Sequence, residues 1–536
     1  MQDLMMADSL NITMIMEYAE QIAADVEIVS ILSNAQHHRY TYADAFRRVR
    51  QLANALDHLQ IDAGEPVATL AWNDYRHFEL YYAAPCSGRI CHTINPRLFP
   101  EQIAYIIQHA QNRIVFLDPQ FIPLLEQLQH QLPAVRHYVA LCAADDLPGS
   151  SLPNLISYET LISEHPDTYS WPDVDERTPS GLCYTSGTTG NPKGVLYSHR
   201  STVLHTLAGS LPEATGLSGD DVVLPIVPMF HVNAWGIPYS AAIAGSKLVL
   251  PGNKAGDGAT LTALINEERV SYALGVPTVW LALLNHLETT GTHIPSLRRA
   301  VSGGSACPLS LIERMRAQDI TLEVGWGMTE TSPLGSYNRH KSWYSQLPED
   351  RRNRQLTSAG RQVFGIRLRI IDDTGRPLPP DGQTAGALQA RGPWVAAGYF
   401  GSAPIAGWFD TGDVATIDPH GYVHIVDRTK DVIKSGGEWI SSIDIENAVM
   451  AHPAVLEAAV IGLPHPNWGE RPVLIVVPRQ DGAPEPSELL EFLKGRIAKW
   501  WLPDACLLAA TLPHTATGKV SKKELREQYR HIQWPA

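Results

Sequence analysis

The sequence has 536 residues, 44% of them hydrophobic and 18% charged, which is the composition of a folded globular protein and excludes a disordered chain. Its length exceeds what one hydrophobic core usually serves, so we expect at least two domains. The formal net charge of −14 argues against nonspecific binding to nucleic acid, because phosphate backbones favour a basic surface. Any anionic ligand must therefore be held by local donors.

The N-terminus and the cysteines indicate the cellular compartment. The first basic residue is Arg39, so the chain lacks the basic start of a secretory signal, and no apolar run approaches the roughly 18 residues that a membrane helix needs. The six cysteines form neither a CxxC pair nor a cluster with histidines, and scattered thiols in a long chain are typical of a reducing compartment. We expect a cytoplasmic protein without disulfides and without a membrane span.

Helical and strand patterns alternate in the first part of the chain. Apolar residues recur with helical period over residues 42–59, and the turn and apolar run of residues 64–72 predict a strand. A second helix is predicted over residues 77–89, and residues 113–119 (RIVFLDP) predict the next buried strand. This alternation is typical of an α/β domain with a mostly parallel sheet.

A loop rich in glycine and hydroxyl side chains lies at residues 184–195 (YTSGTTGNPKGV), with an apolar run on each side that predicts a strand. Backbone N–H groups and hydroxyls in such a loop converge on phosphate oxygens, and Lys193 adds a positive charge. The chain has neither a Walker A motif nor a GxSxG elbow, which disfavours a P-loop NTPase and a serine hydrolase. A flexible surface turn is the structural alternative, but the flanking strands and Pro192 favour phosphate binding.

The second half repeats the α/β pattern and then changes character. Residues 261–304 predict helix, strand, helix and a strand that ends in two glycines, and ligands gather at such strand ends. After residue 360, short strands broken by Gly and Pro turns predict a β-rich subdomain. A small α+β domain is predicted from about residue 430, with a helix over residues 487–501 and a hinge near residues 427–430.

The loop at residues 184–195 resembles the phosphate-binding signature of the adenylate-forming superfamily, which includes acyl-CoA synthetases, adenylation domains and luciferases. Five further motifs of that family are present, and the resemblance covers essentially the whole chain. They are PMFHVNAWG (228–236), GWGMTET (325–331), WFDTGD (408–413), DRTKDVIKSGGEWIS (427–441) and LPHTATGKVSKKELR (512–526). Each motif alone is compatible with a structural role, so their joint presence carries the identification.

The resemblance implies a nucleotide site. Glu330 is expected to bind Mg²⁺, a hard cation that prefers oxygen ligands, and Trp326 stands where the family usually has Tyr and is expected to stack on adenine. The expected ATP- and AMP-binding residues are Thr185, Ser186, Gly187, Thr188, Thr189, Gly190, Lys193, Gly304, Ser305, Ala306, Gly325, Trp326, Gly327, Met328, Thr329, Asp413 and Arg428.

The resemblance also assigns the chemistry and the domains. It implies an N-terminal domain over residues 1–428 and a mobile C-terminal domain over residues 429–536, which pivots at Lys430. The expected catalytic residues are Lys519, His231, Glu330 and Thr185, and the expected acyl pocket consists of His231, Val232, Trp235 and Gly303. The CoA tunnel is expected to be lined by Lys434, Ser435, Gly436, Gly437, Glu438 and Trp439.

The implied activity is that of an AMP- and pyrophosphate-forming acid–thiol ligase. A carboxylate resists attack by a thiol, so such enzymes first form an acyl-adenylate from ATP and then pass the acyl group to CoA. The segments KSGGEWISSIDIEN (434–447) and IAKWWLPD (497–504) resemble those of short- and medium-chain ligases of fatty acid metabolism, which favours 3-methylmercaptopropionate or a short fatty acid. Trp235 and Trp326 are expected to shorten the acyl tunnel. A carrier protein as acceptor, a luciferase-like oxygenase, a longer fatty or aryl acid, and a nucleotide sensor without turnover are the alternatives. A homodimer is plausible because dimers are common in the family.

Overall fold

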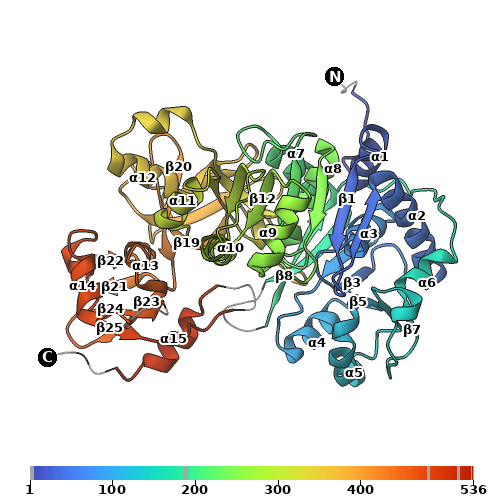
Figure 1. Ribbon diagram of the computed structural model, residues 1–536. Coiled ribbons are helices and arrows are strands. Elements are labelled where there is room, and N and C mark those ends of the chain that lie inside the picture. Colours follow the sequence, from blue (N-terminus) through green and yellow to red (C-terminus); the bar gives the residue numbers. More distant parts are fainter. Residues whose placement is uncertain are drawn as a thin grey trace.

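The protein folds into a large N-terminal body and a small C-terminal body at one end of the molecule (Figure 1). The computed structural model describes residues 5–185, 191–436, 438–479, 483–515, 519–532 and 534, without the side chain of Glu438. Within those ranges, no helix is both long enough and apolar enough to cross a lipid bilayer. The α/β class of the large body and the small additional domain are as predicted.

One sheet of the large body is mostly parallel. It is ordered β7-β6-β5-β3-β4-β8-β9, and only the β8–β9 pairing is antiparallel. An apolar cluster joins one of its faces to α4 (Pro100–His109) and α5 (Ile122–Leu128). In that order the strands are β7 (Leu155–Ser157), β6 (His137–Ala140), β5 (Ile114–Leu117), β3 (Pro66–Leu70), β4 (Ile90–Thr93), β8 (Pro179–Thr185) and β9 (Lys193–Ser198).

A second sheet of thirteen described strands runs through the rest of the large body. Its parallel part continues without interruption into the antiparallel strands after residue 330, so the predicted β-rich subdomain is an extension of this sheet. In spatial order the strands are β17 (Arg367–Ile371), β18 (Gly386–Arg391), β19 (Phe409–Ile417), β20 (Tyr422–Arg428), β16 (Gly360–Gln362), β15 (Leu334–Asn338), β14 (Thr321–Gly327), β13 (Arg299–Ser302), β12 (Tyr272–Gly275), β10 (Val222–Pro225), β11 (Lys247–Leu250), β1 (Glu27–Ile31) and β2 (His37–Thr41).

Helices fill the space between the two sheets and cover the outer face of the second. The inner layer shares one apolar cluster with strands of both sheets and consists of α1 (Ile12–Ile22), α2 (Tyr42–His58), α3 (Tyr75–Cys86), α6 (Tyr158–Ser163), α7 (His199–Gly209) and α8 (Ile237–Ala244). The outer layer consists of α9 (Gly258–Glu267), α10 (Pro277–Thr290), α11 (Leu309–Arg316) and α12 (Glu349–Thr357). The burial of apolar surface on both faces explains the long apolar runs of the central strands.

The predicted helix at residues 42–59 illustrates how local sequence sets an element. Thr41 caps its N-terminus, and the side chain of Asp44 accepts a hydrogen bond from the backbone N–H of Thr41 at 3.0 Å, which completes a capping box. Its apolar positions, among them Phe46, Val49 and Leu52, are fully buried. The predicted helix and its amphipathic pattern are confirmed.

The C-terminal body is a five-stranded sheet with three described helices. The predicted helix over residues 487–501 is wrong in its second half: α14 (Pro486–Leu493) ends before Gly495, whose φ of +76° breaks a right-handed helix. The remaining elements are β21 (Ile433–Ser435), β22 (Glu438–Ile440), α13 (Ser442–Val449), β23 (Val455–His465), β24 (Gly469–Pro478), β25 (Ala505–Leu508) and α15 (Lys522–Tyr529).

Candidate active site

The predicted phosphate loop connects two antiparallel strands, as expected. Thr185 at the end of β8 pairs with Lys193 at the start of β9, so the loop is tied at both ends. Ser186, Gly187, Thr188, Thr189 and Gly190 lie outside the described residues. The Lys193 ammonium lies 4.9 Å from the ring centroid of Tyr399, within cation–π range.

Glu330 follows β14 on a short turn of helix, Thr329–Thr331, and is buried. The hydroxyl of Tyr399 donates a hydrogen bond to Oε1 of Glu330 at 2.7 Å, and the N–H of Ala396 donates to the Glu330 carbonyl at 2.7 Å. Tyr197 donates to the carbonyl of Thr329 at 2.8 Å. A buried carboxylate with one oxygen held by the Tyr399 hydroxyl is suited to bind Mg²⁺, because Mg²⁺ prefers oxygen donors beside phosphates.

Tyr399 is a site residue that sequence reasoning missed. Its side chain touches both Lys193 and Glu330, two of the predicted site residues. The neighbouring Phe400 donates its N–H to the carbonyl of Gly194 at 2.8 Å. No local pattern around residue 399 marks this role, since the contacts join segments far apart in the chain.

The predicted ribose site forms at the meeting of β14, β19 and β20. Oδ2 of Asp413 accepts a hydrogen bond from the indole N–H of Trp326 at 2.9 Å, and Oδ1 lies 2.8 Å from Nε of Arg428. Burial raises the pKa of Asp413, while Arg428 and Trp326 act in the opposite direction by favouring the charged form. Because Trp326 turns toward Asp413, we assign only Trp235 to the wall of the acyl pocket.

The loop before α15 brings Lys519 into this cluster. A Cβ placed on Gly304 would lie 4.0 Å from Cε of Lys519. Burial, together with the positive charge of Arg428, lowers the pKa of Lys519 to about 8, and the charges of Asp413 and Glu330 oppose that shift. The C-terminal body is therefore oriented with its candidate catalytic lysine directed into the nucleotide site.

The glycines predicted to bind the nucleotide lie where backbone segments approach closely. Gly303 and Gly304 follow β13, whose carboxyl end lies beside that of β14 in the parallel part of the sheet. Ser305 and Ala306 continue from these glycines, and Gly325 and Gly327 lie on β14, which leads into Met328. A Cβ on Gly327 would lie 1.9 Å from the carbonyl oxygen of Pro333, so no other residue fits there.

The candidate acyl pocket lies against the same strands. His231 is half-buried, and its partial burial lowers its pKa to about 3, with Lys519 and Arg97 adding to the shift, so its imidazole is neutral. A Cβ placed on Gly303 would lie 2.8 Å from Cη2 of Trp235. Trp235 belongs to a left-handed turn, Val232 to Trp235, with φ between 46° and 57°. Non-glycine residues hold this conformation at a cost of about 1 kcal/mol or more each, so tertiary contacts impose it.

The predicted CoA residues form a hairpin in the C-terminal body. Lys434 pairs with Trp439 across β21 and β22, and Lys434 is exposed. Ser435 accepts a hydrogen bond from Arg471 at 3.2 Å, and Gly436 has φ +60°. Gly437 and the side chain of Glu438 lie outside the described residues.

The predicted hinge, Lys430, lies in an exposed turn between β20 and β21. Just before it, the buried Asp427 of β20 accepts a hydrogen bond from the N–H of Ser442 in α13 at 2.8 Å, and the Ser442 hydroxyl also donates to Asp427. The Ser442 hydroxyl accepts in turn from the ammonium of Lys522. These contacts join the last strand of the large body to the C-terminal body.

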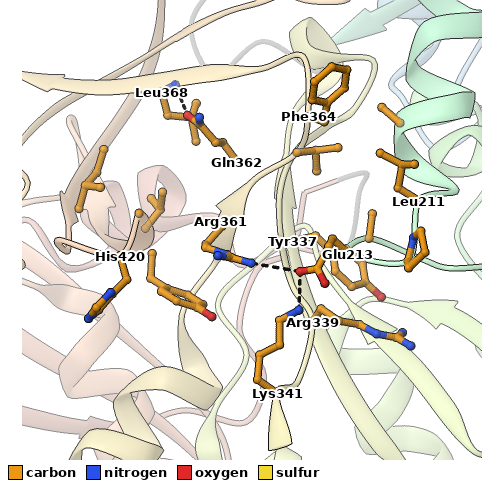
Figure 2. A pocket seen from close by; sticks show the side chains of 18 residues that line it. Leu211, Glu213, Tyr337, Arg339, Lys341, Arg361, Gln362, Phe364, Leu368 and His420 are labelled. Atoms are coloured by element: carbon orange, nitrogen blue, oxygen red, sulfur yellow. Dashed lines mark hydrogen bonds and ion pairs between the residues drawn. The ribbon is translucent and has the colours of Figure 1, made fainter. Parts of the chain in front are cut away.

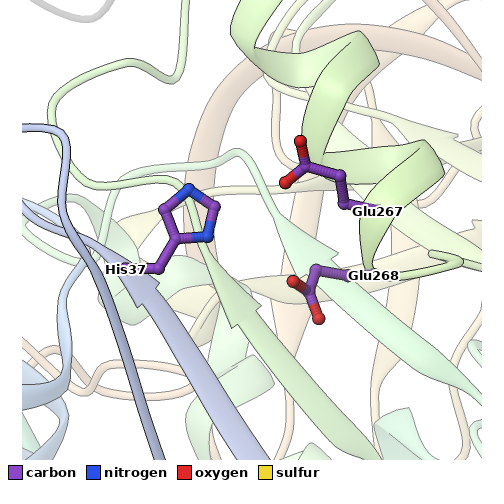
Figure 3. Close-up of side chains that lie close together, drawn as sticks. All are labelled: His37, Glu267 and Glu268. Carbon is purple, nitrogen blue, oxygen red and sulfur yellow. The ribbon is translucent and has the colours of Figure 1, made fainter.

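A group of potential metal ligands lies away from this site (Figure 3). His37, Glu267 and Glu268 bring one ligand atom each to within 4.8 Å of one another. The buried Glu268 already pairs with Arg39 and, at 3.0 Å, with Lys247. Its charge is therefore neutralised by the protein, and we assign no metal to this group.

Comparison with known proteins places these features in a family. The AMP-binding enzyme family model matches residues 17–400, and the model of the AMP-binding enzyme C-terminal domain matches residues 444–519. The chain is 46% identical to a 3-methylmercaptopropionyl-CoA ligase of Ruegeria lacuscaerulensis, with 98% of each chain covered. It is also 46% identical to a medium-chain-fatty-acid–CoA ligase of Ectopseudomonas oleovorans, with 98% of this chain and 97% of the relative covered.

A long-chain-fatty-acid–CoA ligase of Thermus thermophilus is equally similar, at 46% identity over 98% of this chain and 97% of the relative. Among solved structures, ATP-bound MatB from Rhodopseudomonas palustris superposes with a TM-score of 0.81 at 25% identity, covering 97% of this chain and 99% of that one. The anthranilate CoA ligase AuaEII in complex with anthranoyl-AMP superposes with a TM-score of 0.86 at 24% identity, with 97% of each chain covered, and shows the shared fold.

Proposed function

Because the chain belongs to the AMP-binding enzyme family and is an AMP-forming acyl-CoA ligase that uses ATP, Mg²⁺ and CoA, we propose that its substrate is a short- or medium-chain carboxylic acid, with 3-methylmercaptopropionate as the specific acid. The relatives with this acid or a medium-chain acid in their names support the proposal at 46% identity. The structural observation that supports it is the indole of Trp235 packed against Gly303, which would narrow an acyl pocket beside His231.

We assign the activation step to residues around Lys519. The substrate carboxylate would lie beside the neutral His231, and its oxygen would attack the α-phosphate of ATP, with pyrophosphate as the leaving group. The Lys519 ammonium would offset the negative charge that accumulates between carboxylate and phosphate during attack. Bound Mg²⁺ would neutralise charge at the phosphates, with Glu330 as its protein ligand. Lys193 and the hydroxyls of the phosphate loop, Thr185 among them, would donate hydrogen bonds to the phosphate oxygens.

We assign nucleotide recognition to the cluster around Asp413. The carboxylate would accept hydrogen bonds from the ribose hydroxyls, and Arg428 favours its charged form, in opposition to burial, which raises its pKa. Trp326 would stack on adenine while its N–H holds Asp413 in place. Gly304, Gly325 and Gly327 leave the space that backbone contacts with the nucleotide need.

We propose that thioester formation follows a rotation of the C-terminal domain. The proposed boundary is residues 1–428 and 429–536, with the pivot at Lys430. The rotation would withdraw Lys519 and bring residues 434–439 to the acyl-adenylate, where the CoA thiolate attacks the acyl carbon and AMP leaves. We further propose a cytoplasmic location, supported by the six free thiols of the described chain.

The test is an assay of the purified enzyme with ATP, Mg²⁺ and CoA against acids from acetate to decanoate, including 3-methylmercaptopropionate. We expect acid-dependent, equimolar formation of AMP, pyrophosphate and acyl-CoA, with the highest kcat/KM among the short and medium acids. A maximum at long fatty or aryl acids would contradict the proposed substrate. AMP release that needs a carrier protein in place of CoA would contradict the acceptor.

A further inference from the structure

A cavity of about 670 Å³ opens beside the second sheet, between the end of α7 and strands β15, β16 and β20 (Figure 2). Its walls are largely apolar and include Ala208, Leu211, Val363 and Leu368. Its rim carries Glu213, which forms ion pairs with Lys341 and, at 3.1 Å, with Arg361. None of the roles assigned above uses this cavity.

Tyr337 forms the inner wall of the cavity and is itself buried. Its hydroxyl donates to Oε2 of Glu323 at 2.7 Å and lies 3.2 Å from the hydroxyl of Tyr272. Two polar partners at one end of the side chain hold the ring in a single orientation. The Tyr337 ring is therefore held in place, unlike a mobile side chain on the surface.

Tyr337 also lies beside Gly325, which is close to the candidate acyl-pocket residue Gly303. Tyr337 pairs with Gly325 across β14 and β15, and a Cβ placed on Gly325 would lie 3.8 Å from Cδ2 of Tyr337 and 3.7 Å from Cδ1 of Leu334. The carbonyl of Gly325 lies 3.1 Å from a Cβ placed on Gly303, and Gly303 packs against Trp235. The contacts thus run from the candidate acyl pocket to Tyr337 and then to the cavity.

We propose that the ring of Tyr337 is the wall at which the acyl pocket ends, and that the cavity behind it is a distal apolar subsite that becomes available to the tail of a longer acid when the ring is removed. This inference rests on the proposed function, because it assumes that the acyl group lies along Gly303 and Gly325. Tyr337 is then a specificity-determining residue. It acts by excluding methylenes and takes no part in the chemistry.

The cavity suits the tail of a fatty acid in shape and polarity. The apolar side chains of Ala208, Val363 and Leu368 line the cavity together with the ion-paired Glu213, and the tail of a longer acid would pack against the apolar ones. Apolar pockets discriminate by about tenfold or more per methylene. A wall at one fixed position therefore produces a steep limit on chain length, and the removal of the wall shifts that limit.

The experiment compares the wild type with Tyr337→Ala and Tyr337→Phe for pyrophosphate exchange into ATP across straight-chain acids from butyrate to hexadecanoate. We expect Tyr337→Ala to raise the ratio of kcat/KM for decanoate to that for butyrate by about tenfold or more. Tyr337→Phe keeps the ring and loses only the hydroxyl, so its length profile should follow that of the wild type. Phe364→Ala is the matched control, because Phe364 lines the outer side of the same cavity and is 81% exposed; its profile should not change.

A second measurement does not depend on turnover. Thermal stabilisation of each folded variant by butyrate or decanoate reports binding alone, and we expect decanoate to stabilise Tyr337→Ala more than the wild type. An unchanged length profile and unchanged stabilisation in folded Tyr337→Ala would overturn the inference, as would undiminished use of hexadecanoate by the wild type. Failure of the wild type to exchange pyrophosphate with any acid would instead contradict the proposed function, and the binding comparison would still decide the position of the wall.

Discussion

The indole N–H of Trp326 donates to Oδ2 of Asp413 at 2.9 Å, while Arg428 holds the other carboxylate oxygen at 2.8 Å. The aromatic ring expected to stack on adenine is thereby joined to the carboxylate expected to bind ribose. A buried carboxylate without such donors would favour its protonated form and lose recognition of the ribose hydroxyls. The two recognition elements therefore depend on each other.

Trp326→Phe tests this dependence. Phenylalanine keeps an aromatic face and loses the N–H, so we expect the KM for ATP to rise about tenfold, as for the loss of one hydrogen bond to a charged group, with little change in the KM for the acid. ATP titration in the exchange assay measures it. Trp343→Phe is the control, because Trp343 is 39% exposed and its ring packs against Tyr344. Equal effects in both variants would contradict the role of Trp326.

Tyr399→Phe tests the link between Lys193 and Glu330. The variant keeps the ring under the Lys193 ammonium and removes the hydroxyl that orients Glu330. We expect the Mg²⁺ concentration for half-maximal activity to rise about tenfold, with most of the rate restored at saturating Mg²⁺. Direct Mn²⁺ binding in the presence of ATP gives a second readout. If Mg²⁺ dependence stays at the wild-type value, Tyr399 does not position the metal ligand.

The pKa of Lys519 predicts a pH dependence. Burial holds this pKa at about 8, below the ordinary value of 10.5, and only the protonated amine can offset phosphate charge. In the free enzyme the active form is lost as pH rises, so kcat/KM for ATP in the exchange reaction should fall above about pH 8. Lys519→Arg should move that fall to higher pH, because a guanidinium stays charged. A wild-type profile that is flat up to pH 10 would contradict the assignment.

The lowered pKa of Lys519 also affects stability: activity is expected to fall as the pH rises, whereas stability is expected to increase. Between about pH 8 and 10.5, the unfolded chain retains the Lys519 proton that the folded protein has lost. The free energy of unfolding therefore gains a contribution that rises with pH in this window. Lys519→Met should remove this rise, which chemical denaturation at pH 7.5 and 10 would measure; an unchanged difference between the two pH values would show that the folded pKa is not lowered.

Ser442→Ala tests whether the contact across the proposed hinge favours the observed arrangement. Asp427 of β20 accepts from the backbone and the hydroxyl of Ser442, and that hydroxyl also accepts from Lys522, which is three residues from Lys519. We expect the variant to slow pyrophosphate exchange about tenfold, while acyl-AMP supplied directly is converted to thioester at an undiminished rate. Ser150→Ala, on the exposed side of the large body, is the control. Equal losses in both half-reactions would show that the contact between Asp427 and Ser442 does not favour one domain arrangement over the other.

The sequence predicted which residues come together in the candidate site better than it predicted the contacts that shape it. The motifs around Lys193, Glu330, Asp413 and Lys519 are local runs, and their residues converge because strand ends and loops bring them together. Tyr399 was missed because its partner Glu330 is 69 positions away. The continuation of the sheet after residue 330 depends on pairings such as β16 with β20, which no periodicity reveals.

The helix that was predicted too long shows a different limit. Residues 487–501 keep a helical apolar pattern, but Gly495 adopts a left-handed φ and the chain turns. The hydrophobic period alone does not show whether the chain continues as a helix or turns at Gly495 to pack on the sheet. The proposed role of Tyr337 also could not be predicted from the sequence. Whether an aromatic ring separates two cavities depends on the space on both of its sides, which only the structure shows.

Exchange of labelled pyrophosphate into ATP, with 3-methylmercaptopropionate or butyrate as the acid, tests most directly whether Lys519 completes the formation of the acyl-adenylate. Lys519→Ala should lower the exchange rate by about a hundredfold or more, keep the affinity for ATP within about threefold and still convert supplied acyl-AMP and CoA to thioester. Wild-type exchange rates in Lys519→Ala would show that another group supplies the charge, and that the lysine seen beside Gly304 and Asp413 is not the catalytic one.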